Sequence, residues 1–129
     1  MTITLLCILI YMFFEGVTEG LNNLPVKTLW WQTDGFYHFY RTIQCGAILG
    51  AIMFWPGFTW LHVAALACVW TGGNALFNRT LVKVVQKSWL AVNNGPFTFL
   101  KWSFPYPEGF TGESEFVTLL LFTGAAFIL

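Results

Sequence analysis

Five ionisable side chains in the first third of the chain have the spacing of a shared functional site. Glu15 and Glu19 are four residues apart, as are Asp34 and His38, and Arg41 follows three residues later. Residues three or four apart project from the same face of a helix. Two neighbouring helices carrying these residues would therefore bring three carboxylates, an imidazole and a guanidinium together.

Three kinds of chemistry are open to this polar cluster. Arg41 can pair with Glu15 or Glu19 and hold two helices together, while Asp34 caps its helix or orients His38. The carboxylates can instead exchange protons, because a medium of low dielectric constant perturbs their ionisation, and form a proton or ion path. Glu15, Glu19, Asp34 and His38 could also bind a metal, although the Glu-x-x-His spacing of four-helix di-metal sites is absent.

His62 is a separate candidate. Small residues follow it at Ala64, Ala65 and Ala67, so that a flat haem- or chlorophyll-type pigment could approach and take the imidazole as an axial ligand. A lone histidine can equally hydrogen-bond to a neighbouring helix. No cofactor is predicted, and a metal or a pigment is kept as an alternative.

The composition indicates the surroundings of these residues. Of 129 residues, 57% are hydrophobic and 9% are charged, whereas soluble domains carry about 25% charged residues. Six basic and six acidic side chains cannot cover a surface that faces water, so we expect an integral membrane protein. The net charge of zero argues against nucleic acid as a partner.

The expected fold is all-α, a single membrane domain over residues 1–129. Four apolar segments are expected to cross the membrane as helices, at about residues 2–20, 35–55, 58–78 and 112–129. Trp55, Pro56 and Gly57 separate the middle two segments and predict a tight hairpin between them. The alternatives are three crossings, with residues 1–20 on the surface, or a cleaved signal peptide at the N-terminus.

The segment between the third and fourth crossings divides into two parts. Residues 80–92 predict an amphipathic helix, because Lys83, Gln86 and Lys87 share one face. Residues 93–111 predict an aromatic loop rich in proline and glycine, which is either an interfacial aromatic belt or a docking surface for a partner subunit or lipid. Every Lys and Arg lies in or beside two connections on one side, which predicts a plasma or inner membrane with those connections cytoplasmic and both termini outside.

Small residues favour close packing between helices. The glycines concerned are Gly16, Gly20, Gly46, Gly50, Gly72 and Gly73. The chain has no Gly-x-Ser-x-Gly, phosphate-loop or His-Glu-x-x-His motif, so an enzyme is not expected. The sequence predicts a small non-catalytic accessory subunit of a larger membrane complex, in contact with lipids and with other subunits of a hetero- or homo-oligomer. An oligomeric proton or small-ion transporter and a metal- or pigment-binding subunit are the alternatives.

Overall fold

A computed structural model of the chain describes residues 1–24, 26–87, 89, 97–99, 102–104 and 112–129. Within these residues it contains four α-helices, a short 3-10 helix and a β-hairpin. The helices are α1 (Thr2–Asn22), η1 (Trp30–Gln32), α2 (Asp34–Met53), α3 (Trp60–Gln86) and α4 (Gly112–Ile128). The all-α class is therefore confirmed for the described residues, with the hairpin as a small addition.

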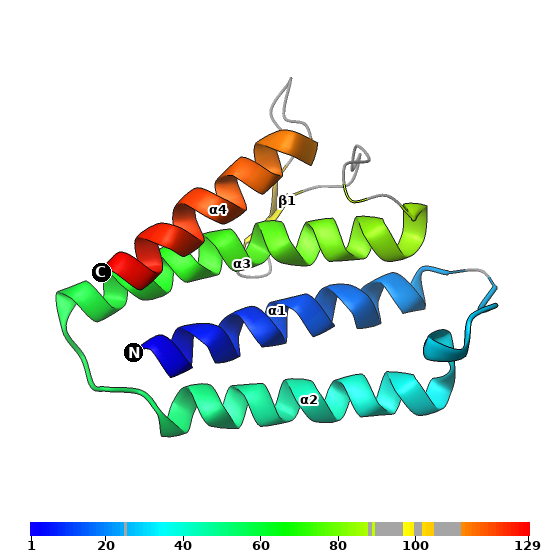
Figure 1. Cartoon of the computed structure of the whole chain (residues 1–129), viewed down its shortest axis with the longest axis horizontal. Coiled ribbons are helices and arrows are strands. Elements are labelled where there is room, and N and C mark those ends of the chain that lie inside the picture. Colours follow the sequence, from blue (N-terminus) through cyan, green and yellow to red (C-terminus); the bar gives the residue numbers. More distant parts are fainter. Residues whose placement is uncertain (25, 88, 90–96, 100–101, 105–111) are drawn as a thin grey trace.

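The four long helices lie in a row in the order α2, α1, α3, α4 (Figure 1). Successive helices along the chain run in opposite directions, so that both termini lie at the same end as the connection between α2 and α3. Two apolar clusters link neighbouring helices. Leu5, Val69 and Ala126 belong to the cluster at the end that holds the termini, and Leu21 and Val84 to the cluster at the opposite end.

The expected tight hairpin of the second and third crossings is not formed, because α1 lies between α2 and α3. Residues 54–59 join the two helices, and Gly57 turns the chain there with a φ of 98°. This is a left-handed conformation that glycine adopts without a Cβ clash. The physical reason for the order is the small-residue face of α1, which lets α3 approach α1 closely.

α3 is longer than the predicted third crossing and includes most of the segment predicted as a separate amphipathic helix. It runs unbroken to Gln86 and ends at Lys87, which has a left-handed φ of 59°. The sequence from Asn74 to Lys87 contains no glycine or proline, so nothing interrupts the helix where the charged residues begin. Residues 88 and 90–92 of that prediction lie outside the described residues.

A β-hairpin lies within the segment predicted as an aromatic loop. β1 (Phe97–Phe99) pairs antiparallel with β2 (Trp102–Phe104), and β1 lies against α3. The sequences Phe-Thr-Phe and Trp-Ser-Phe alternate aromatic and hydroxyl residues, a pattern that favours strands. The predicted docking surface of aromatic side chains over 93–111 lies outside the side chains that the structure describes.

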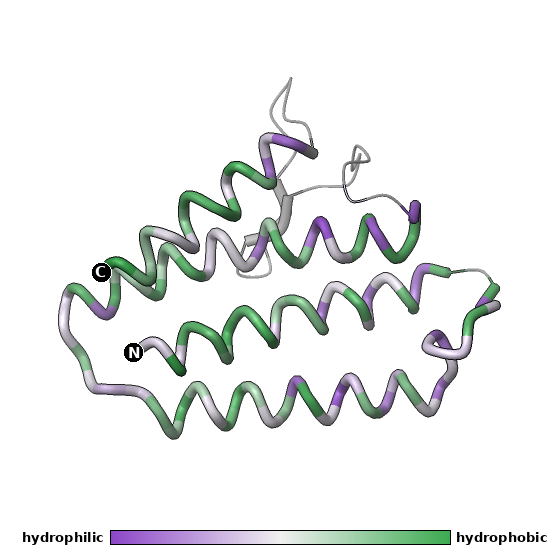
Figure 2. The backbone as a smooth tube through the Cα atoms, viewed as in Figure 1, coloured by the Kyte–Doolittle hydropathy of each residue, from purple (hydrophilic) through white to green (hydrophobic). Residues whose placement is uncertain are grey.

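Among the described helices, α1 and α3 are long and apolar enough to cross a membrane. The polar residues of α1, α2 and α3 concentrate toward the end of the row that lies away from the termini (Figure 2). Large apolar side chains are exposed toward the other end of α2, where Ile52 is 67% and Met53 is 78% exposed. These features are compatible with a membrane location.

Candidate functional site

Glu15 of α1 and Arg41 of α2 form an ion pair across the α1–α2 interface. Arg41 Nη1 donates to Glu15 Oε2 at 3.0 Å and to Gln44 Oε1 at 3.1 Å. Gln44, which is buried, donates through Nε2 to the same Glu15 oxygen. The three side chains thus close a ring of hydrogen bonds that joins the two helices.

Tyr37 completes the surroundings of the Arg41 guanidinium. Arg41 Nε donates to the Tyr37 hydroxyl at 3.3 Å, and the guanidinium carbon lies 5.6 Å from the centre of the Tyr37 ring. The side chains of Arg41 and Glu15 are 42% and 26% exposed, so the pair lies at the edge of the interface. The Glu15 carboxylate is hydrogen-bonded and its charge is balanced, which stabilises the contact between α1 and α2.

The other members of the predicted cluster lie apart from this pair. Asp34 is 89% exposed and accepts a hydrogen bond from Lys27 Nζ at 3.1 Å. His38 is exposed on α2, and Glu19 is half-buried one turn further along α1. Among the described residues no three His, Cys, Asp or Glu side chains gather as metal ligands would. The predicted metal ligands therefore do not converge.

The reason is the direction in which α2 faces α1. Gln44 and Ala47, the buried residues of α2, mark the centre of the face that contacts α1. At 100° per residue, Asp34 and His38 lie well outside that face, and Arg41 lies at its edge. Only Arg41 has a side chain long enough to reach Glu15 from there.

His62 connects the start of α3 to the preceding chain. Its Nδ1 lies 2.7 Å from the Gly57 carbonyl oxygen and, because a carbonyl only accepts, donates to it. Its backbone N–H donates to the Thr59 hydroxyl at 3.2 Å, which caps α3. These contacts give His62 a structural role, and the pigment-ligand hypothesis stays a prediction.

Gly16 and Gly20 place α1 directly against α3. A Cβ atom at Gly16 would stand 2.6 Å from the Phe77 carbonyl oxygen, and one at Gly20 would stand 2.7 Å from Val84 Cβ. Real Cβ atoms do not approach other atoms so closely, so larger residues at these positions would push the helices apart. This contact is what sets α1 between α2 and α3.

The four other predicted packing glycines divide into two kinds. Gly50 and Gly73 lie close to side chains across helix contacts that involve α1, and Gly72 lies against α4. Gly46 differs, because a Cβ atom there would have nothing within 4 Å. Its small size is therefore not used in the packing of the described helices.

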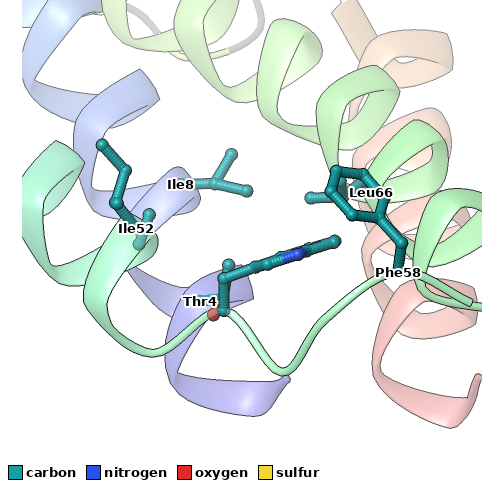
Figure 3. Close-up of a pocket in the computed structure, with 7 residues that line it drawn as sticks. Thr4, Ile8, Ile52, Phe58 and Leu66 are labelled. Carbon is teal, nitrogen blue, oxygen red and sulfur yellow. The ribbon is translucent and has the colours of Figure 1, made fainter.

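An apolar cavity of about 360 Å³ lies beside α1, close to the connection between α2 and α3 (Figure 3). Ile8, Ile52, Phe58 and Leu66 are among the side chains that line it. Thr4 also lines it, but its hydroxyl already donates to the Phe54 carbonyl at 2.8 Å. The cavity therefore offers mainly dispersion contacts to a group that fills it, and Trp55, which also lines it, has an indole Nε1 without a hydrogen-bond partner among the described residues.

A buried ion pair between α3 and α4 was missed by the sequence reasoning. Arg79 Nε donates to Glu115 Oε2, and each side chain is only 2% exposed. Asn78 Nδ2 lies 3.4 Å from Glu115 Oε1, and Arg79 Nη1 donates to the Trp89 carbonyl at 3.2 Å. The sequence carried a signal, because Arg79 and Glu115 have opposite charges at the ends of consecutive antiparallel apolar segments.

The two helix–helix ion pairs have the same chemical consequence. Glu15–Arg41 joins α1 to α2, and Arg79–Glu115 joins α3 to α4. Paired and hydrogen-bonded charges of this kind stabilise contacts between helices in an apolar medium. Comparison with known proteins adds no further assignment, since no family model, curated protein or solved structure matches the chain.

Proposed function

We propose that the chain is a small non-catalytic subunit of an integral membrane complex, with α1 to α4 all crossing the bilayer. The antiparallel row places the four helices side by side, and α1 and α3 meet the length and hydropathy of spanning helices. The described basic residues lie in the polar half of the helix row or in the connections at that end, which favours a cytoplasmic location for that end and an outside location for the termini.

The observation that carries the proposal is the outward face of α2. Opposite the face that contacts α1, the stretch of α2 from residue 38 to residue 46 exposes His38, Thr42, Cys45 and Gly46. Small and polar residues are typical of contacts between membrane helices, where they allow close approach and hydrogen bonds. Lipid tails cannot hydrogen-bond to an imidazole, and contact with lipid does not require the close approach that an exposed glycine allows.

The face continues toward the apolar end as a lipid-compatible surface. Leu49 is 60% exposed and Met53 is 78% exposed, on the same side as Cys45. The partner is therefore a membrane-spanning helix of another chain that contacts α2 over residues 38–46. Gly46 is the point of closest approach, because an added Cβ meets no other atom of the described chain within 4 Å.

A pair of matched variants tests the proposal. Gly46 of α2 and Gly124 of α4 both have open space around an added Cβ, so we expect Gly46→Leu and Gly124→Leu to leave the fold intact. In native membranes, extracted in mild detergent and separated by native electrophoresis, the wild-type chain should migrate as part of a larger complex. Gly46→Leu should release it, and Gly124→Leu should not.

Two results would count against the subunit role. One is a wild-type chain that migrates at the size of a single copy after cross-linking in intact membranes. The other is an equal response of the complex to both variants. The transporter and the metal- or pigment-binding alternatives remain predictions, which proton flux in vesicles, elemental analysis and an absorption spectrum of the same preparation would test.

A further inference from the structure

A second cavity, which unlike the apolar one is lined by charged side chains as well, lies at the polar end of the molecule. It lies between the α1–α2 connection and the last turns of α3. Its volume is about 540 Å³. The connection supplies a largely apolar wall, and α3 supplies valines together with two lysines. The lining residues used below are Leu24, Trp31, Gln32, Lys83, Val84 and Lys87.

Lys83, in the last turn of α3, is held in place by the helix terminus. Lys83 Nζ donates to the Lys87 carbonyl at 2.9 Å, and Lys87 ends α3 in a left-handed conformation. An ammonium has three N–H donors, so two remain for a ligand. In the part of the chain that the structure describes, neither lysine forms a salt bridge, whereas Lys27, outside the cavity lining, pairs with Asp34.

Gln32 contributes a neutral donor to the same cavity. It is only 5% exposed, and its Oε1 accepts the backbone N–H groups of Thr28 and Leu29 at 2.9 and 3.0 Å. These two bonds fix the carboxamide. Its Nε2 donates to no group among the described residues and is not one of their fully buried atoms without a partner, so this donor is accessible at the wall of the cavity that Gln32 lines.

The length of α3 places the cavity at the depth of lipid headgroups. α3 has 27 residues, or about 40 Å at 1.5 Å per residue. The hydrocarbon core of a bilayer is about 30 Å thick. With Trp60 at the opposite interface, the last turns of α3, which carry Lys83 and Lys87, extend beyond the hydrocarbon into the headgroup layer.

We propose that this cavity binds an anionic phospholipid of the surrounding bilayer. The phosphate accepts from Lys83, Lys87 and the Gln32 amide, and an acyl chain lies along Leu24 and Val84. Basic pockets at this depth suit anionic headgroups, and the apolar wall suits a chain that a soluble anion lacks. The inference rests on the membrane location and does not require a partner subunit.

The test uses the purified full chain in vesicles of phosphatidylcholine and phosphatidylglycerol with identical acyl chains. Native mass spectrometry after release from detergent measures which lipid stays bound. The wild-type chain should retain phosphatidylglycerol preferentially. Each lysine near a lipid surface contributes about fivefold in affinity, so Lys83→Gln with Lys87→Gln should reduce the preference about 25-fold. Lys27→Gln removes the same charge outside the cavity and should leave the preference unchanged.

Several outcomes would overturn the proposal. If the wild-type chain retains both lipids equally, the proposal is wrong. This result needs no variant, so it holds even if the double variant does not fold. An equal loss in Lys27→Gln would indicate general surface charge. Displacement of phosphatidylglycerol by millimolar inorganic phosphate would indicate a phosphate site that does not need the lipid. Because no partner is present, these results are independent of the subunit role.

Discussion

Replacing Glu115 by leucine leaves the Arg79 guanidinium buried without its carboxylate. Arg79 and Glu115 side chains are each 2% exposed, so neither charge gains solvent when the other is removed. Removing one partner of a buried ion pair lowers the free energy of unfolding by about 3–5 kcal/mol. We expect this loss for Glu115→Leu, and the same for Arg79→Leu, which leaves the carboxylate buried alone.

The double variant is expected to lose much less unfolding free energy than the two single variants lose together. Two leucines leave no buried charge, and apolar replacement of a whole buried pair is often neutral. What remains is the loss of the hydrogen bonds to Asn78 and to the Trp89 carbonyl, at about 1 kcal/mol each. The free energy of unfolding of the double variant should therefore lie about 2 kcal/mol below that of the wild type. If the losses of the two single variants simply added, the difference would be about 6–10 kcal/mol.

The measurement is a double-mutant cycle on the reconstituted full chain, unfolded by sodium dodecyl sulfate in mixed micelles and followed by circular dichroism. The coupling energy should be about 4 kcal/mol or more on the figures above. Single variants that lose less than about 1 kcal/mol, or losses that simply add, would refute the burial of the α3–α4 pair.

Three further substitutions test separate contacts in the same unfolding assay. Gly16→Leu should lower the free energy of unfolding by about 1–3 kcal/mol, because its Cβ meets the carbonyl of α3 at 2.6 Å, whereas Gly124→Leu should be neutral. Thr59→Ala should lose about 1 kcal/mol by removing the cap of α3, and Thr59→Ser should restore it. Gly57→Ala should lose about 1–3 kcal/mol because its φ of 98° disfavours a side chain, and no change would argue against the turn.

Much of the helical content could be predicted from the sequence, because long uncharged segments are typical of membrane-spanning helices. A Pro-Gly pair separates the two middle segments. The end of α3 does not follow. Charged residues from Arg79 onward mark the end of an apolar segment, but they do not break a helix, so α3 continues to Gln86. Hydropathy reports the surroundings of a helix, and its termination depends on glycine, proline or a left-handed residue such as Lys87.

The order of the helices could not be predicted either. Sequence adjacency favours contact between α2 and α3, but the glycine face of α1 packs more closely against α3. The Glu15–Arg41 pair is one of the alternatives that the spacing leaves open, because both residues were expected on neighbouring helices at similar depth. His38 lies outside the α1–α2 contact because of the direction in which α2 faces α1. That direction is set by the buried residues Gln44 and Ala47 rather than by charge.

The central position of α1 has a consequence for how the chain is made. α1 leaves the ribosome before α2 and α3, yet it packs between them. A nascent chain that ends after α2 therefore has one side of α1 covered and the Gly16–Gly20 side still uncovered. Packing of α3 then covers this side, and the connection of residues 54–59 must carry the chain past the N-terminal end of α1. The α1–α3 contact is thus made only after α2 has been synthesised, and α4 completes the row by packing against α3.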